Sequence, residues 1–398
     1  MHLTQEEEDI LAGEAGEGRQ WAMELLVGLG RIFGAEDLVP IESAQLAGVS
    51  YKTIGEAGLS WLQDVSRHSV VSVPAMLNPA GMDPNRWEDM GVTEEFAGRQ
   101  RAILRAYNRM GVELTCTCTP YLIGRSPGFG EHVAWSESNA VSYCNSVLGA
   151  RTNREGGPSA LAAAIVGKTP RYGLHLPTNR LPTAVVEVDP GETNVDYGAL
   201  GVHIGRELGD AIPFFKGLRP TADELKTLGA AMAATGAIAL FHVRNVTPEA
   251  RTGVEPDRSL PTLQVGPVEL EEAYRSLSAS LKEQDVELVT IGCPHVSIDE
   301  LEEIAQFLRG RNRREGAPDL WVCTSKDVKK LGTEAVKVIE EFGKVLVDTC
   351  MVVAPIDKVA SVTATNSGKA ATYLPLDSFC GQRVLYRSTP MLLSLLVE

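Results

Sequence analysis

Three of the seven cysteines come shortly after stretches that are predicted to be β-strands. The strands are expected at 112–117, 286–291 and 344–347, and the cysteines that follow them are Cys118, Cys293 and Cys350. In parallel α/β sheets, the loops beyond the carboxyl ends of the strands gather around one cleft, so these thiols could meet there. An electron-transfer 4Fe–4S cluster uses four thiolates. Three thiolates would leave one iron open to act as a Lewis acid on a hydroxyl group.

The opposite interpretation is that each of these thiols is a small core residue, as a cysteine at a buried strand end usually is. The chain has no C-x-x-C pair, which is the strong form of a metal or redox signal. Cys116 lies two residues before Cys118 and shares its face of the expected strand, so it is the nearest alternative ligand. We interpret Cys144, Cys323 and Cys380 as core or incidental thiols.

Short polar segments beside glycine or proline are candidates for contacts with an anionic substrate. Backbone N–H groups and small polar side chains suit this task, above all at helix starts. The segments are Gly48-Val49-Ser50, Asn78-Pro79, Ser138-Asn139 and the loop 366–369, which ends in Lys369. Each has an ordinary alternative role: the serines could be helix caps, Asn78 a turn residue, and Lys369 a solvated charge.

Two arginines and two histidines are further candidates. Arg151 and Arg154 could hold a carboxylate or phosphate through two parallel hydrogen bonds, or form structural ion pairs with Glu155 or Glu137. His132 and His295 could act as general acid or base. A lone histidine near a turn is more often a structural hydrogen-bonding residue, so both interpretations stay open.

The elements that must position these residues alternate between helix and strand. In the C-terminal half, strands at 237–243, 286–291, 320–323 and 344–347 alternate with helices at 268–283, 299–308 and 333–342. Such repeated units favour a mainly parallel sheet with helices on its faces. Earlier in the chain, a helix at 138–148 is expected to end at Gly149. The fold class is therefore α/β.

The chain has 398 residues, which is too long for one core. We expect an N-terminal helical module at 1–66, a central α/β module at 67–219 and a C-terminal α/β module at 220–398.

The composition excludes several classes of protein. The net charge of −15 argues against a nucleic-acid binder and against a polybasic membrane contact, although a local pocket can still be positive. The apolar stretch at 228–243 contains Gly229 and Gly236, and it is too short and interrupted to span a bilayer. The N-terminus lacks the basic start and apolar core of a secretory signal, so the cytoplasm is the expected location.

Several blocks of sequence resemble the aconitase X family. The most specific block runs through 145–158 and reads NSVLGARTNREGGP. Shorter blocks are LNPAGMD at 77–83, CTPY at 118–121, SNAV at 138–141, GCPH at 292–295 and NSGKA at 366–370. The resemblance covers nearly the whole chain, from about residue 40 to residue 380.

This resemblance implies an aconitase-like, multi-module core with mainly parallel sheets and without the mobile swivel domain of the family. Because the chain ends at Glu398, soon after its last module, we expect that domain on a separate small subunit. The resemblance also implies a 4Fe–4S cluster on Cys118, Cys293 and Cys350. It implies substrate contacts at Gly48, Val49, Ser50, Asn78, Pro79, Ser138, Asn139 and Lys369. The catalytic base is expected on the small subunit, and none is assigned here.

The implied activity is a hydro-lyase reaction that dehydrates (R)-5-phosphomevalonate to trans-anhydromevalonate 5-phosphate, in an archaeal mevalonate route to isoprenoids. One alternative is a dehydratase of the same fold acting on another hydroxy acid, such as cis-3-hydroxy-L-proline. The other is a binding or scaffold homologue that has lost the cluster.

Overall fold

The strands of the described residues form four sheets, three of which are wholly parallel. The computed structural model describes residues 1–189, 191 and 194–398. The antiparallel sheet pairs β1 (Leu38–Pro40) with β5 (Lys168–Pro170). The three-stranded parallel sheet has the order β3 (Ala75–Leu77), β2 (Ala44–Leu46), β4 (Ala134–Trp135). The four-stranded sheet has the order β8 (His242–Val243), β7 (Pro213–Lys216), β6 (Ala184–Val188), β9 (Thr262–Val265). The five-stranded sheet has the order β12 (Lys344–Val347), β11 (Asp319–Thr324), β10 (Leu288–Ile291), β13 (Val362–Thr365), β14 (Arg383–Tyr386).

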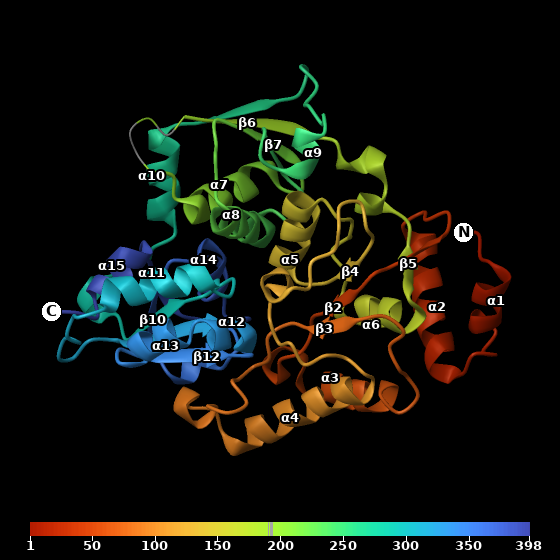
Figure 1. Ribbon diagram of the computed structural model, residues 1–398, viewed down its shortest axis with the longest axis horizontal. Helices are drawn as coiled ribbons and strands as arrows, with labels where there is room; N and C mark the ends of the chain where they lie inside the picture. Colours follow the sequence, from red (N-terminus) through yellow and green to blue (C-terminus); the bar gives the residue numbers. More distant parts are fainter. Residues whose placement is uncertain (190, 192–193) are drawn as a thin grey trace.

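Helices cover these sheets and fill the space between them (Figure 1). The α-helices are α1 (Gln5–Leu11), α2 (Glu17–Ile32), α3 (Tyr51–Val65), α4 (Glu94–Arg109), α5 (Ser138–Tyr143), α6 (Gly157–Val166), α7 (Tyr197–Leu208), α8 (Ala222–Thr235), α9 (Pro248–Arg251), α10 (Pro267–Ser276), α11 (Ile298–Leu308), α12 (Lys326–Leu331), α13 (Thr333–Glu340), α14 (Gly368–Tyr373) and α15 (Thr389–Ser394). The expected α/β class with mainly parallel sheets is confirmed.

The N-terminal part is built around the three-stranded sheet and the buried helix α6. Residues 159–166 of α6 are all buried, and this helix packs against both α2 and β2. Strands β1 and β2 fall within 1–66, the range expected to be helical. The four-stranded sheet takes β6 and β7 from before residue 220 and β8 and β9 from after it, so it lies across the expected boundary between the second and third modules.

The five-stranded sheet is the one that positions two of the candidate ligands. Its strands are parallel, so the carboxyl ends of β10 and β12 lie at the same edge. The strands expected at 286–291 and 344–347 are these two, with β10 shorter than expected. The helix expected at 299–308 is α11, and Ser297 caps it in a capping box with Glu300.

The strand expected at 112–117 is wrong. The segment is extended but forms only an isolated bridge at Glu113. The Thr115 hydroxyl takes the place of a ladder partner, because it accepts from the Leu77 N–H and donates to the Leu77 carbonyl, each at 3.1 Å. Cys116 also has a positive φ of 45°, which no regular strand contains.

Three other expected elements are shorter or different. The strand expected at 237–243 is reduced to β8, and Ala237, its expected first residue, has a left-handed φ of 60°. The helix expected at 268–283 is α10, which ends at Ser276. The helix expected at 138–148 is α5 followed by one π-helical turn at Cys144–Leu148, and Gly149 ends it with a φ of 71°, as expected.

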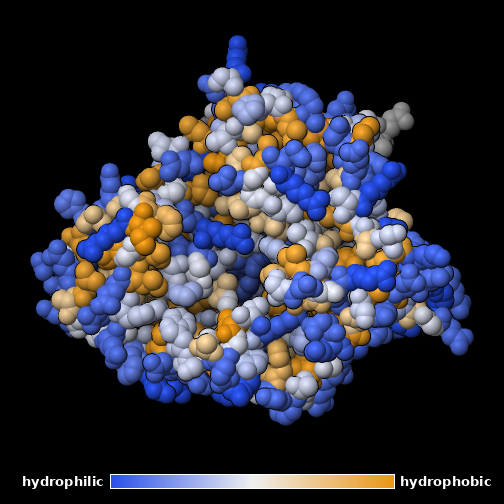
Figure 2. Space-filling view, turned by 180° about the vertical axis from the view of Figure 1, so that it is seen from behind, coloured by the Kyte–Doolittle hydropathy of each residue, from blue (hydrophilic) through white to orange (hydrophobic). Residues whose placement is uncertain are grey.

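The face opposite to that of Figure 1 is hollowed near its centre, and hydrophilic residues lie around the hollow (Figure 2). No helix in the described ranges is long and apolar enough to cross a membrane.

Candidate functional site

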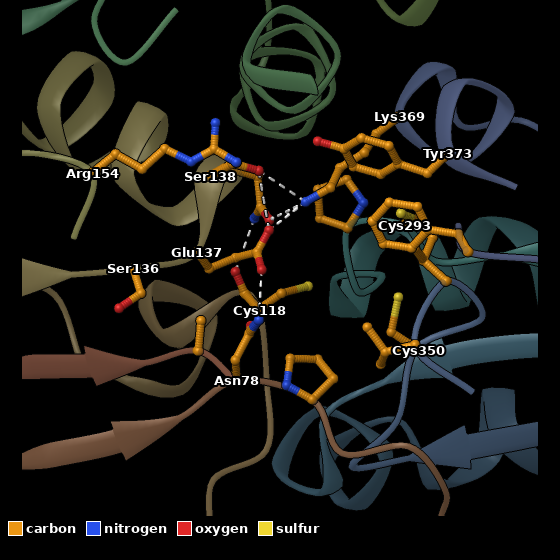
Figure 3. Close-up of a pocket in the computed structure, with 17 residues that line it drawn as sticks. Asn78, Cys118, Ser136, Glu137, Ser138, Arg154, Cys293, Cys350, Lys369 and Tyr373 are labelled. Carbon is orange, nitrogen blue, oxygen red and sulfur yellow. Dashed lines mark hydrogen bonds and ion pairs between the residues drawn. The ribbon is translucent and has the colours of Figure 1, made fainter. Parts of the chain in front are cut away.

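One cavity of about 220 Å³ collects residues from the N-terminal part and from the five-stranded sheet. Its lining contains most of the candidates (Figure 3). The residues that line it are Ala47, Asn78, Pro79, Cys118, Ser136, Glu137, Ser138, Asn139, Arg154, Cys293, Pro294, Cys350, Val352, Val353, Lys369, Tyr373 and Phe379. Segments far apart in the sequence therefore build one wall.

The three candidate cysteines share this cavity. Cys293 follows β10, Cys350 follows β12, and Cys118 follows the extended segment beside Leu77. Their sulfur atoms face the same space in Figure 3, and the residues are 6%, 9% and 5% exposed, respectively. Of the other cysteines, none lines the cavity, and Cys116, Cys144, Cys323 and Cys380 belong to the hydrophobic clusters.

The three cysteines are the residues of this cavity that could hold a metal group. Among the described residues, no three His, Cys, Asp or Glu side chains lie close enough to share one metal ion. A 4Fe–4S cluster requires a wider spacing, because each thiolate binds a different iron atom. A hydrogen bond with Cys293 and burial raise the pKa of Cys350 well above its usual value, and burial raises the pKa of Cys118. Both thiols are therefore protonated without a metal, which would favour their thiolate forms.

A buried ion pair forms the polar wall opposite the cysteines. The Lys369 ammonium contacts the Glu137 carboxylate, and these side chains are 10% and 13% exposed. Lys369 Nζ also donates to Ser138 Oγ at 3.0 Å and to Asn139 Oδ1 at 3.4 Å. Asn78 Nδ2 donates to Glu137 Oε2 at 2.5 Å. The interpretation of Lys369 as a solvated surface charge is wrong.

The two charges stabilise each other inside the protein. Burial by itself would raise the pKa of Glu137, but the Lys369 ammonium and the Asn78 amide outweigh it and hold that pKa below 4.5. Burial would lower the pKa of Lys369, but Glu137 outweighs it and raises that pKa. Both groups are therefore charged near neutral pH. With Arg154, the cavity wall carries two cations and one carboxylate, which gives it a net positive charge.

Two polar atoms of the wall connect to the rest of the site in different ways. Asn139 Nδ2 donates to the Cys118 carbonyl at 2.8 Å and so braces that loop. Asn78 Oδ1 is buried and finds no hydrogen-bond partner among the described residues. Because a buried acceptor without a partner is costly, this oxygen is suited to a ligand donor.

The segment Gly48-Val49-Ser50 does not line the cavity, although its neighbour Ala47 does. Ser50 Oγ donates to the Val353 carbonyl at 2.8 Å and accepts from Lys52 N, so Ser50 is the N-cap of α3. Val49 is buried in the core. These residues hold the loop after Cys350, and their contact with substrate stays a prediction.

The second group of candidates divides between the cavity and the protein interior. Arg154 lines the cavity, whereas Arg151 does not. His132 Nδ1 lies 2.9 Å from His175 Nδ1, outside the cavity. The His295 ring is fully buried behind the cysteines, and burial lowers its pKa to about 4. It is therefore neutral near pH 7 and has no path to a substrate.

Sequence reasoning missed Glu137 as the central carboxylate of the site and missed the aromatic rim formed by Tyr373 and Phe379, whose rings stack at 5.2 Å. The sequence indicates Glu137 only as an ion-pair partner for arginine, and no local pattern distinguishes it from a surface glutamate. The one local signal is a polar run, Ser136-Glu137-Ser138, at the start of the buried helix α5.

Comparisons with known proteins show the family of this chain. Three family models match in order: the aconitase X first domain at residues 1–178, the second domain at 182–275 and the third domain at 286–398. The phosphomevalonate dehydratase large subunit of Methanocaldococcus jannaschii is 50% identical over 97% of this chain and 98% of its own length. Other archaeal relatives at 49–51% identity carry the same name.

A more distant relative is the cis-3-hydroxy-L-proline dehydratase of Hypocrea jecorina, which is 33% identical over 98% of this chain and 67% of its own length. Among solved structures, the holo form of aconitase X from Thermococcus kodakaraensis superposes with a TM-score of 0.91 at 46% identity, covering 99% of both chains. Together these matches extend over nearly the whole chain, and the chain belongs to the aconitase X family.

Proposed function

We propose that this chain is the large subunit of a phosphomevalonate dehydratase that converts (R)-5-phosphomevalonate to trans-anhydromevalonate 5-phosphate and water. One observation carries the proposal: three cysteines and the Lys369–Glu137 pair line a single cavity. The chain shares about half of its residues with archaeal relatives of that name over nearly its full length.

The proposed cofactor is a 4Fe–4S cluster held by Cys118, Cys293 and Cys350. When bound, it supplies an iron without a protein ligand, which acts as a Lewis acid on the hydroxyl group that leaves. The three thiols are buried at the edge of one cavity, so they can hold such a group away from bulk solvent.

The residues of this chain bind and orient the anionic substrate. Lys369 and Arg154 attract its carboxylate and phosphate groups, since the wall has one more cation than anion. Asn78 Oδ1 accepts a hydrogen bond from a substrate hydroxyl, because it has no other partner in the described part of the chain. Ser138 and Asn139 contribute short polar contacts beside Lys369.

The proposed partner is a small subunit that carries the swivel domain and supplies the base for the C2 proton. None of the described residues that line the cavity is a free carboxylate or histidine, since Glu137 is committed to Lys369. We place the reaction in the cytoplasm.

A dehydratase of cis-3-hydroxy-L-proline is the second candidate, because a relative of that name is 33% identical to this chain. The two substrates differ in charge. Phosphomevalonate carries a phosphate and a carboxylate, whereas hydroxyproline carries one carboxylate and an ammonium group. The net positive wall formed by Lys369, Arg154 and Glu137 favours the first.

The test is co-expression of this chain with the small subunit from the same genome, followed by anaerobic reconstitution with iron and sulfide. Water loss from (R)-5-phosphomevalonate and from cis-3-hydroxy-L-proline is then compared by product analysis. We expect brown protein with turnover of the phosphorylated substrate only. Turnover of hydroxyproline alone would favour the second candidate, and a colourless, inert complex would favour a scaffold without a cluster.

A further inference from the structure

We propose that His295 is a positioning residue whose buried ring holds the three cysteine-bearing loops in one arrangement. The effect of His295 on catalysis rests on the proposed function. The contacts of the ring with the loops are independent of that proposal. The His295 side chain is fully buried and lies outside the cavity lining. It therefore acts through the loops that it touches and has no contact with the substrate.

The ring makes two hydrogen bonds that define its tautomer. Nε2 lies 2.7 Å from the carbonyl oxygen of Thr349, and Nδ1 lies 3.0 Å from Oγ1 of Thr117. A carbonyl oxygen can only accept, so Nε2 carries the proton. Nδ1 then accepts from the Thr117 hydroxyl, which leaves both ring nitrogens satisfied by neutral partners.

These partners are the residues directly before two of the candidate ligands. Thr117 precedes Cys118 and Thr349 precedes Cys350, while His295 itself lies two residues after Cys293. One ring thus joins three loops that come from different parts of the chain.

The backbone of His295 strengthens the same connection. Its N–H group donates to Cys118 Sγ at 3.3 Å, and its carbonyl accepts from Lys226 Nζ at 3.3 Å. Lys226 is itself fixed by ion pairs with Asp223 and Glu300. The loop that contains Cys293 is therefore anchored from both sides, which places the Cys118 sulfur against it.

Loss of the ring removes the donor that satisfies the buried Thr349 carbonyl, whereas the Thr117 hydroxyl keeps its contacts with the Thr119 backbone N–H and hydroxyl. The loops must therefore shift to satisfy the carbonyl. Groups that orient metal ligands from behind typically change metal retention by about 10–100-fold when they are removed. We therefore expect His295 to govern how firmly the three thiolates hold iron.

Two variants of similar polarity separate the contacts. Gln in His295→Gln is long enough to donate to the Thr349 carbonyl, whereas Asn in His295→Asn is too short. His242→Asn is the matched control, since His242 is 1% exposed, its Nε2 lies 2.8 Å from the Arg180 carbonyl, and neither residue lines the cavity. Thr117→Val removes the hydroxyl that donates to Nδ1, together with its contacts to the Thr119 backbone N–H and hydroxyl. It serves as a second test should His295→Asn not fold.

Two measurements are made on the full chain with its small subunit. The first is the rate at which a chelator removes iron from the reconstituted protein. We expect about ten-fold faster loss for His295→Asn and a near wild-type rate for His242→Asn. His295→Gln and Thr117→Val both keep the contact with the Thr349 carbonyl and lose the one between Thr117 and Nδ1, so we expect a smaller and similar increase for the two, about three-fold. The second is the yield with which a thiol-bridging reagent links Cys293 to Cys350 in the metal-free protein, which should fall most in His295→Asn.

The outcomes separate this proposal from the proposed function. If the wild type takes up no iron, the proposed function fails. The cross-link yields alone then test the positioning role of His295. If the wild type holds iron, and the folded His295→Asn variant retains iron and cross-links as well as the wild type, the positioning role is refuted. Equal losses in His242→Asn would also overturn it, because they would show a general effect of a buried histidine.

Discussion

Replacement of Lys369 by methionine should destabilise the protein by leaving Glu137 buried without its cation. The Glu137 side chain is 13% exposed, so water cannot replace the ammonium group. Removal of one partner from a buried ion pair typically costs about 3–5 kcal/mol of unfolding free energy. Hydrogen bonds from Asn78 and Ser138 remain, at 2.5 Å and 3.2 Å. We therefore expect the lower end of that range, about 3 kcal/mol.

The double variant Glu137→Gln/Lys369→Met tests whether the loss comes from the unpaired charge. Glu137→Gln alone also leaves a buried charge, that of Lys369, whereas the double variant leaves none. The double variant should therefore be more stable than the sum of the single losses predicts, with a coupling of about 2 kcal/mol. Denaturant unfolding of the metal-free chain under reducing conditions measures all four free energies.

The dependence on pH has a defined sign. In the wild type, the folded-state pKa of Glu137 is held below 4.5, so its stabilisation is present at neutral pH and is lost as the pH falls through that lowered value. In Lys369→Met, burial would raise the pKa of Glu137 above its unfolded value. Protonation then relieves the destabilisation, so the deficit of this variant should shrink between pH 7 and pH 5.

The control is Lys337→Met, which breaks an exposed ion pair with Glu334 whose side chains are 65% and 78% exposed. That change should alter the unfolding free energy by no more than about 0.5 kcal/mol. Strictly additive losses in the double variant, or a Lys369→Met deficit that stays constant with pH, would refute the reasoning.

Three further predictions concern the frame of the site. Cys293→Ser should abolish both the brown colour and the turnover, whereas Cys323→Ser should keep both; bleaching by the second change would mean that the ligand set is wrong. Gly292→Ala should lose iron and unfold more easily, because Gly292 has a φ of 106° and an added Cβ would lie 2.2 Å from the Cys323 carbonyl. Gly310→Ala, also at positive φ but with open space around it, controls for backbone strain. Arg180→Met should lower the unfolding free energy by about 3–5 kcal/mol, because the Arg180 side chain is 2% exposed and forms a buried ion pair with Glu249. Denaturant titration measures this loss, and a value below about 1 kcal/mol would contradict the expectation.

Local patterns in the sequence were sufficient for three strands of the five-stranded sheet, β10, β11 and β12, whereas β13 and β14 were not predicted. Short apolar, β-branched runs predicted β10 and β12, and the Ser297 capping box predicted the start of α11. Each of these signals depends on neighbouring residues only. Because the strands are parallel, the chain order alone was enough to expect Cys293 and Cys350 at one edge.

Tertiary structure decided the rest. Glu137 and Lys369 are 232 residues apart, so no local periodicity could pair them. The Ser50 hydroxyl donates to the Val353 carbonyl, a contact between residues 303 positions apart that no local pattern indicates, and its contact with substrate stays a prediction. From the sequence, His295 is predicted to be an ordinary turn histidine. Its contacts with Thr117 and Thr349 are visible only in the folded structure. The sequence by itself determined which residue types could do chemistry, and it determined that Cys293 follows β10 and Cys350 follows β12. Only the packing of the three parts decided which of those residues meet, because burial and long-range hydrogen bonds depend on the whole fold.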